Sequence, residues 1–376
     1  MSSIADFTDV FTINTFAKPP SAAFQLNFLR DIQWLLESSS YNSTYKFALL
    51  MSLVNLSIES GIGDNSSHTI SYRQLAEQFM YLYWRQTIPF SAQDQHSILK
   101  QGINSGKDAV IEQILKLQQL TKTKSMNGAR TSEPKTWKST LSKLARIVKD
   151  KPAKHLQSAE NNNNREFMYV YDTKSNEIVL KPGIAYCLSR FSKIINKLCQ
   201  QYWSDFVRKN SHNQGYFSDD IDLKQFLFQQ PRLYLGKLQD VLIDAQHGQC
   251  FYCHKPLKED AKNRTEVDHF IPWSKYPVDT VHNFVLADHS CNNKKRDYLA
   301  EEKFYEQWLI RNQQYGQAIE AESQSQNLGF INNRQRSETV SQWAYQLAVE
   351  YEDLVWSPDR GLRIIEPSLL RNIRGF

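Results

Sequence analysis

The residues most able to do chemistry lie close together between positions 250 and 297. Cys250 and Cys253 come first, Asp268 and His269 follow, and a basic run occupies positions 294–296. Three of the five cysteines and four of the nine histidines fall between residues 250 and 291. Oxygen ligands, an imidazole and nearby cations are what metal-assisted chemistry on a phosphate backbone requires. The stretch therefore predicts a metal-dependent site that acts on phosphate esters.

Two short strands and a helix are expected to position these residues. Residues 267–271 are rich in β-branched and aromatic side chains and stop at a proline, as a strand does. A second strand is expected at 283–286, and a helix at 291–308 and beyond. Neighbouring residues on a strand point to opposite faces, so Asp268 and His269 can serve one site only near the strand end.

This strand, loop, strand and helix unit resembles the ββα-metal motif of the HNH endonuclease family. The resemblance makes His269 the general base, Asp268 a metal ligand, Asn283 a brace for the site and Asn292 the second ligand. Asn283 follows His269 by 14 residues and Asn292 follows Asn283 by 9. Both spacings suit the family form in which asparagine replaces the last histidine. The resemblance covers about 50 of the 376 residues.

Membership of this family would imply hydrolysis of DNA phosphodiester bonds with Mg²⁺ or Mn²⁺ held by Asp268 and Asn292. His269 would take the proton from the attacking water. Because one HNH unit cuts one strand, a monomer would nick DNA. Two alternatives stay open. One is a non-catalytic nucleic-acid-binding or adaptor protein that keeps a zinc-held HNH scaffold, and the other is an RNA-cleaving enzyme of the family.

The cysteines predict a separate, structural metal site. Cys250 and Cys253 form a Cys-x-x-Cys pair after a turn, and Cys291 offers a third thiolate beside Asn292. This pattern favours zinc. Relatives usually place Cys or His three residues before the third cysteine, but this chain has Asp288 there. The fourth ligand could therefore be Asp288 or His289, or the zinc site could be incomplete. Cys187 and Cys199 are expected to be small core residues.

Two basic segments could contact nucleic acid. Lys294, Lys295 and Arg296 follow Asn292 and are expected to bind phosphates beside the scissile bond; the alternative is a solvated helix face. The segment 121–155 carries ten Lys or Arg residues against two acids. A helix at 137–149 within it could track phosphates or could simply be a solvated helix.

The fold class predicted for the whole chain is mainly α with a small α+β insert. Residues 1–20 are expected to be a leader and 21–219 a helical region for recognition or docking, with a hairpin near 166–181. The nuclease domain is expected at 220–310, with its core at 248–298, followed by a helical C-terminal extension at 311–376. The arrangement loosely resembles bacterial HNH proteins found with antiphage defence genes, which would make other defence proteins candidate partners.

Several local elements follow from hydrophobic periodicity and turn residues. Helices are expected at 21–37, 45–60, 71–84, 104–120, 222–229, 231–245 and 337–355, and one long helix at 184–209. A loop is expected at 122–134, because the segment is rich in Gly, Ser, Thr and Asn. The helical pattern fades in the Gln-, Ser- and Asn-rich stretch 313–335.

Composition bounds the remaining possibilities. A chain of 376 residues is long enough for two or three domains, or for one core with extensions, and its 41% of hydrophobic residues supports a globular protein. No apolar run approaches the length of a membrane span. Five cysteines, an odd number, argue against a disulfide framework and predict a reducing, cytoplasmic location. The net charge of +5 is modest, so its uneven distribution is more informative than its size.

Overall fold

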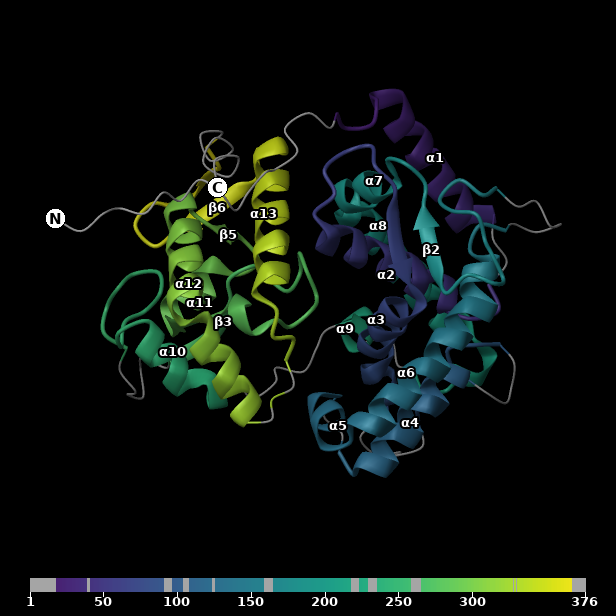
Figure 1. Cartoon of the computed structure of the whole chain (residues 1–376), viewed down its shortest axis with the longest axis horizontal. Helices are drawn as coiled ribbons and strands as arrows, with labels where there is room; N and C mark the ends of the chain where they lie inside the picture. The colour runs from purple at the N-terminus through teal and green to yellow at the C-terminus, as the bar shows by residue number, and fades with distance from the viewer. Residues whose placement is uncertain are drawn as a thin grey trace.

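The computed structural model describes residues 18–38, 41–90, 97–103, 108–123, 126–158, 165–217, 223–228, 235–257, 265–326, 328 and 330–366. Residues 1–17 of the expected leader lie outside this part of the chain. Among the residues described, the fold is mainly helical with three small sheets, which confirms the predicted fold class. A helical N-terminal half and a C-terminal half that contains the ββα unit lie beside each other (Figure 1).

The N-terminal half contains nine α-helices and two strands among the residues described. They are α1 (Ala22–Ser38), α2 (Tyr45–Ser60), β1 (His68–Ser71), α3 (Tyr72–Trp84), α4 (Ala109–Thr121), α5 (Met126–Ser132), α6 (Pro134–Val148), β2 (Glu177–Leu180), α7 (Ile184–Arg190), α8 (Ser192–Lys209) and α9 (Leu223–Phe228). A π-helical turn, η2 (Lys149–Ala153), extends α6.

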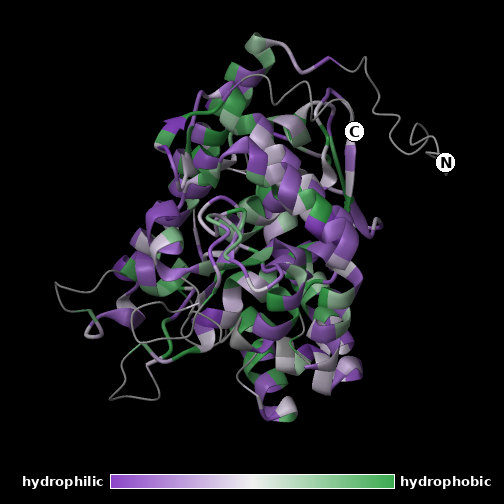
Figure 2. Ribbon diagram, turned by 90° about the vertical axis from the view of Figure 1, so that its left-hand side faces the viewer, coloured by the Kyte–Doolittle hydropathy of each residue, from purple (hydrophilic) through white to green (hydrophobic). Residues whose placement is uncertain are grey.

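Helix α2 forms the centre of this half. Its residues from Phe47 to Ile58 are all buried, which suits a helix that is apolar on every side. The one amide among them, Asn55, donates from Nδ2 to Gln78 Oε1 of α3 at 2.9 Å. Gly61 then ends the helix with a φ of 65°, a conformation that favours glycine. Hydrophilic and hydrophobic residues are mixed along the helices that are visible from the side (Figure 2).

Three local predictions in the N-terminal half were wrong. The expected loop at 122–134 contains the short helix α5. The long helix expected at 184–209 is broken at Phe191, whose φ of −96° and ψ of 16° separate α7 from α8. In the expected hairpin, β2 forms its antiparallel ladder with β1 instead, and Tyr169 makes only an isolated bridge to Leu180. Sequence proximity favoured the hairpin, but the more distant strand completes the ladder.

The C-terminal half builds the ββα unit and surrounds it with two long helices. Its elements are η5 (Leu235–Leu238), α10 (Gln239–Ala245), β3 (Thr265–His269), η6 (Val281–Asn283), β4 (Phe284–Asp288), α11 (His289–Lys295), β5 (Leu299–Ala300), α12 (Glu302–Ser325), α13 (Arg334–Glu350), β6 (Leu354–Ser357) and β7 (Gly361–Ile364). Strands β3 and β4 pair antiparallel, with His269 opposite Phe284. Strand β5 pairs with β6, which pairs with β7.

The helix expected from 291 past 308 is two helices. Helix α11 ends at Lys295 because Arg296 adopts a φ of 49°, and β5 intervenes before α12 begins. The expected fading of the helix from position 313 was also wrong. Helix α12 continues to Ser325 because its buried Ile319 packs in a cluster with Leu238, Val281 and Phe330. Strands β6 and β7 were not predicted.

A buried polar junction joins the two halves. Glu59, near the end of α2, accepts hydrogen bonds from Tyr276 Oη at 2.8 Å and from the Arg336 guanidinium at 2.6 Å. Gln78 of α3 donates to the same oxygen, Oε1, at 3.0 Å. Tyr276 lies in the loop after β3, and Arg336 lies in α13. The N-terminal helices are therefore bonded directly to the loop that follows His269.

No helix in the described ranges is both long enough and apolar enough to cross a membrane.

Candidate functional site

The ββα unit places strand β3 against helix α11. Asp288 ends β4 and begins α11, where its side-chain Oδ1 accepts the backbone N–H of Cys291 at 3.0 Å. This N-cap makes the helix begin directly after the strand. Side chains share one face of a strand every two residues and one face of a helix every three to four residues. Residues two apart on β3 therefore contact residues three apart on α11.

The outer pairing across this interface joins Glu266 to two residues of α11. Glu266 Oε2 accepts from Asn292 Nδ2 at 2.6 Å, and Glu266 Oε1 lies 2.8 Å from His289 Nδ1. Asn292 therefore uses its amide N–H on the strand, and its Oδ1 makes no hydrogen bond to another described residue. An amide oxygen of this kind is a hard ligand that suits Mg²⁺.

The inner pairing joins Asp268 to Lys295, three residues after Asn292. Lys295 Nζ lies 2.9 Å from Asp268 Oδ2 and donates to the His269 carbonyl at 2.8 Å. Tyr252 Oη donates to the same Asp268 oxygen at 2.5 Å. Burial and the adjacent Asp268 carboxylate raise the pKa of Tyr252 well above its usual value, so Tyr252 stays a neutral donor. Asp268 Oδ1 has no hydrogen bond to a described residue.

Lys295 corrects one expectation from the sequence. Its side chain is fully buried, and its ammonium is bound to Asp268 and a backbone carbonyl. The phosphate contact expected of Lys295 therefore does not fit its position. Lys294 and Arg296 are exposed, as a phosphate contact requires.

His269 ends strand β3, and its ring lies on the face of the strand opposite to that of Asp268. Its Nε2 lies 2.8 Å from Asp279 Oδ1. Because a carboxylate only accepts, Nε2 carries the hydrogen and Nδ1 is left as the acceptor in the neutral ring. The ring packs edge-on against Phe284 and Trp273, with centroids 5.0 and 5.7 Å away. About a quarter of the His269 side chain, 24%, is exposed.

Asn283 clamps the chain that follows His269. Its Oδ1 accepts the Ile271 backbone N–H at 2.7 Å, and its Nδ2 donates to the Ile271 carbonyl at 2.9 Å. The backbone of Phe270 also donates to the Asn283 carbonyl at 2.7 Å. This geometry suits the bracing role expected of Asn283.

The structure thus gathers Asp268, His269, Asn283 and Asn292 in one ββα unit. The side chains of Asp268, His269 and Asn292 make no hydrogen bond or ion pair with one another in the described chain. Asp268 and Asn292 both lie at the β3–α11 interface, whereas the His269 ring takes its partner from the loop before β4. Three atoms make no hydrogen bond to another described residue: Asp268 Oδ1, His269 Nδ1 and Asn292 Oδ1.

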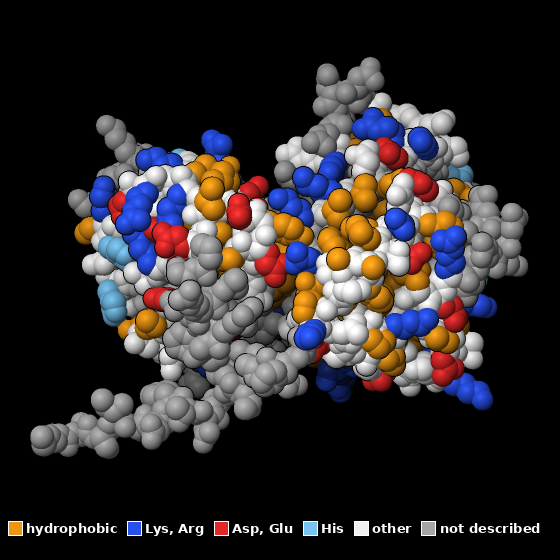
Figure 3. Space-filling view, turned by 90° about the horizontal axis from the view of Figure 1, so that it is seen from above, with side chains coloured by type: hydrophobic (Ala, Val, Ile, Leu, Met, Phe, Trp, Pro, Cys, Tyr) orange, Lys and Arg blue, Asp and Glu red, His pale blue; other side chains and the backbone are white. Residues whose placement is uncertain are grey.

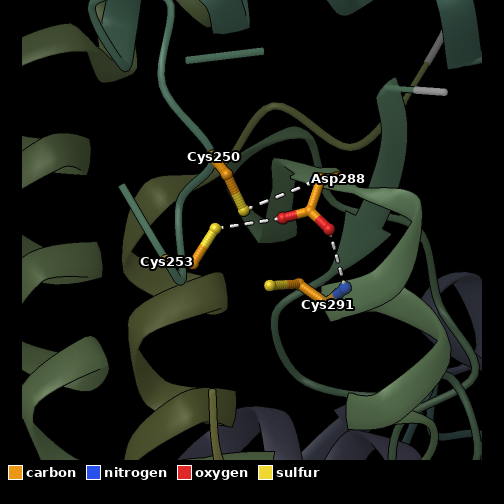
Figure 4. A group of neighbouring side chains, drawn as sticks. All are labelled: Cys250, Cys253, Asp288 and Cys291. Atoms are coloured by element: carbon orange, nitrogen blue, oxygen red, sulfur yellow. Dashed lines mark hydrogen bonds between the residues drawn. The ribbon is translucent and has the colours of Figure 1, made fainter. Parts of the chain in front are cut away.

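The three expected cysteines and Asp288 converge on one point (Figure 4). Their sulfur and carboxylate ligand atoms all lie within 4.8 Å of one another. The Cys253 thiol donates to Asp288 Oδ2 at 3.1 Å, and the Asp288 backbone N–H donates to Cys250 Sγ at 3.4 Å. Three thiols and one carboxylate are a suitable donor set for tetrahedral zinc.

Hydrogen bonds and burial shift the pKa values of these four groups in different directions. The hydrogen bond from Cys291 lowers the pKa of Cys250 to about 7, and it raises the pKa of Cys291. Burial raises the pKa of Cys253 to about 11. Burial also pushes the pKa of Asp288 upward, but hydrogen bonds from the thiols outweigh it and hold that pKa below its usual range. Cys250 is thus the thiol that ionises most easily.

Of the three alternatives for the fourth ligand, the geometry favours Asp288. His289 points away from the cysteines: its two ring nitrogens contact Glu266 and Asn293, and half of its side chain is exposed. Cys187 and Cys199 are fully buried in the helical half, as expected.

Three residues of the site were missed from the sequence. Glu266 could have been found, because it lies two residues before Asp268 and so shares its strand face. Asp279 and Tyr252 gave no such signal, since each reaches the site from a loop. Their contacts depend on how the chain folds back between β3 and β4, and after Cys250.

Comparison with known families finds matches in two parts of the chain. Residues 25–227 match a domain of unknown function, DUF8808, which covers more than half of the chain. The chain therefore belongs to the family defined by that domain. Residues 250–300 match the HNH endonuclease family, so the ββα unit is an HNH domain. No curated protein matches the chain.

Proposed function

We propose that this protein is a metal-dependent endonuclease that hydrolyses DNA phosphodiester bonds and nicks one strand as a monomer. One observation carries the proposal. The HNH domain presents a partly exposed imidazole, His269, whose Nε2 is bonded to a carboxylate and whose Nδ1 is unbonded among the described residues. An imidazole held in this way can accept a proton from water.

In this proposal His269 is the general base and acts through Nδ1. Asp279 is a positioning residue, because its carboxylate fixes the ring and the tautomer through Nε2. Phe284 and Trp273 restrict the ring further by packing against it. Asn283 clamps the backbone two residues beyond His269, which holds the strand end in place.

Asp268 and Asn292 are the residues that we propose hold the divalent cation, and their oxygen donors fit Mg²⁺ or Mn²⁺. Each has one oxygen without a hydrogen bond to another described residue. When bound, the ion would neutralise charge that develops on the phosphate. Lys295 holds the other oxygen of Asp268 and so orients the carboxylate from inside the domain. The exposed Lys294 and Arg296 are the proposed phosphate contacts beside the cut bond.

A structural zinc ion bound by Cys250, Cys253, Asp288 and Cys291 is the second part of the proposal. The four ligand atoms already lie within 4.8 Å of one another. Since Cys291 precedes Asn292 in α11, a zinc ion there would fix the helix that carries a proposed catalytic metal ligand.

A cleavage panel tests the proposal. Purified protein with Mg²⁺ or Mn²⁺ is incubated with supercoiled DNA, linear duplex and single-stranded RNA. Nicked DNA from the wild type, and none from His269→Ala of unchanged circular dichroism, is the expected result. Cleavage of the RNA alone would move the assignment to a ribonuclease.

One contact favours the alternative of a non-catalytic, nucleic-acid-binding scaffold. The buried Lys295 already supplies Asp268 with a positive partner, as a domain without a catalytic cation would need. Duplex binding without cleavage under every metal condition would support this second candidate.

We extend the proposal to antiphage defence on the sequence resemblance alone. Phage plating on cells that express the wild type or His269→Ala tests it. Equal plating on both would remove the defence role and leave the nuclease untouched.

A further inference from the structure

The outward face of helix α6 is the strongest charged feature outside the HNH domain. This helix spans Pro134–Val148, about 22 Å at the usual rise per residue. Four cations, Lys135, Lys138, Lys143 and Arg146, are exposed along it. The helix contains no acidic residue.

The opposite face of α6 is anchored in the core. Trp137, Leu141, Leu144 and Val148 are buried there, so the helix cannot rotate to hide its cations. The π-helical turn η2 continues the helix directly, and the exposed Lys151 lies within it. The basic face is therefore a fixed surface of the folded protein.

The charges on this face work against the helix itself. Lys135 lies three residues before Lys138, and Lys143 lies three residues before Arg146, so like charges are neighbours on the surface. Lys135 also lies in the first turn, where the helix dipole disfavours a cation. In the described chain, none of these four cations has an ion pair with an acidic side chain. A bound polyanion would offset this repulsion.

An ordinary solvated surface carries charges of both signs. The face of the molecule seen from above has this character, with Lys and Arg side chains among Asp and Glu (Figure 3). Within α6 the cations are not interleaved with acids; the nearest acids in the sequence, Glu133 and Asp150, flank the helix at its two ends. That difference favours binding over simple solvation.

We propose that the outward face of α6 binds the sugar-phosphate backbone of double-stranded DNA, away from the cut site. The inference rests on the proposed function, because it names a second contact with the same substrate. Duplex is favoured over single strands because the exposed face of α6 has no aromatic side chain on which bases could stack; Trp137, the aromatic residue of this helix, is buried. Contacts to phosphates alone make this binding independent of sequence.

The test measures how duplex affinity depends on salt. All binding is measured in His269→Ala protein without divalent metal, so that cleavage plays no part. The basic-face variant changes Lys135, Lys138, Lys143 and Arg146 to glutamine. The matched control is Lys193→Gln with Lys197→Gln, since both of these lysines are exposed on α8.

Each lost phosphate contact should lower the slope of log affinity against log salt by about 0.9, so the basic-face variant should lose roughly three to four units. The control should keep the original slope. If the fourfold variant does not fold, Lys135→Gln with Lys138→Gln, and Lys143→Gln with Arg146→Gln, should each lose about half of that change.

An unchanged slope in the basic-face variants would overturn the inference, and so would a loss in the two-residue control equal to that of a two-residue basic-face variant. Tighter binding of single strands than of duplex would overturn the choice of duplex DNA. The two proposals fail separately. A wild type that does not cleave, while the basic-face variants lose salt slope, removes the proposed function only; normal cleavage with an unchanged slope removes this inference only.

Discussion

The proposed role of His269 as general base depends on a carboxylate that is ten residues away in the sequence. Asp279 Oδ1 lies 2.8 Å from His269 Nε2, and the Asp279 side chain is only 13% exposed. The Ile331 backbone N–H also contacts the Asp279 carbonyl at 3.4 Å. Asp279 is therefore held from both its backbone and its side chain, and it can orient the imidazole.

Replacing Asp279 should slow turnover without weakening substrate binding. Asp279→Ala removes the bond to Nε2, so we expect kcat for nicking to fall about 10- to 100-fold with KM unchanged. Asp279→Asn keeps an oxygen that can accept from Nε2 and should retain more activity than Asp279→Ala. Steady-state nicking kinetics check both variants. A rise in KM with kcat unchanged would instead assign Asp279 to DNA binding.

A second residue-scale prediction concerns His282, which is fully buried. Burial, together with the nearby Arg311 and Arg334 cations, lowers its pKa to about 4. Its Nε2 lies 3.1 Å from Glu320 Oε1, but the two are not aligned as a hydrogen bond. In the unfolded chain the imidazole binds a proton at higher pH, so acid favours unfolding.

The free energy of unfolding should therefore fall by about 2 kcal/mol between pH 7 and pH 5 because of this one group. The loss begins near the unfolded pKa and is complete below the folded one. Urea denaturation at both pH values measures it. His282→Gln, which does not titrate, should show a smaller pH dependence; an equal pH dependence in both proteins would contradict this assignment.

At the scale of elements, Asp288 links three structures. It ends β4, caps α11 and belongs to the cysteine cluster. The expected helix after β4 was correct in kind, but its end was not, because the positive φ of Arg296 has no clear signal in the sequence. Likewise, periodicity located α2 at Tyr45–Ser60, whereas only tertiary pairing decides that β2 joins β1.

For the candidate site too, the sequence predicted the local unit but not the tertiary contacts within it. Residue types and spacing placed Asp268, His269, Asn283 and Asn292 in one unit. They could not show that Lys295 turns inward to Asp268, because a lysine in the last turn of a helix is usually solvated. The contact between Asp279 and His269 could not be predicted either, because the contacts of a loop residue depend on the path of the whole loop.

Variants at Asp288 separate its role as N-cap of α11 from its proposed role as a zinc ligand. Asp288→Asn keeps an oxygen that can cap α11 but removes the negative charge, whereas Asp288→Ala removes both. We expect the wild type to contain about one zinc ion per chain and both variants to bind zinc more weakly. Asp288→Ala should unfold more easily than Asp288→Asn, by about 1 kcal/mol for the lost cap.

Elemental analysis and urea denaturation measure the two effects. Cys250→Ser serves as a control that removes a zinc ligand and leaves the cap of α11 in place. Undiminished zinc content in Cys250→Ser and Asp288→Ala would contradict the Cys3Asp site.

At the scale of the whole molecule, the junction at Glu59 connects the DUF8808 region to the HNH domain. Burial raises the pKa of Glu59, and Arg336 opposes that rise. Tyr276 bonds to both groups, and its loop lies between His269 and Asp279. The helical half can therefore influence the loop that carries the positioning carboxylate.

Breaking this junction should destabilise the protein and impair nicking. Arg336→Met leaves the Glu59 carboxylate without its cation, and removing one partner of a buried pair costs about 3–5 kcal/mol. Adding Glu59→Gln should recover part of that loss, because no unpaired charge then stays buried. Urea denaturation of the two single variants and the double variant measures the coupling. Strictly additive losses would show that the two side chains do not act together.

The most direct test of the central claim is a strand-break assay on supercoiled plasmid with Mg²⁺ or Mn²⁺, comparing the wild type with His269→Ala at equal zinc content. We predict that the wild type converts plasmid to the nicked circle and that His269→Ala slows this conversion by about 10²- to 10⁴-fold. Equal rates of nicking by the two proteins would contradict the assignment of His269 as the general base and, with it, the proposed nuclease mechanism.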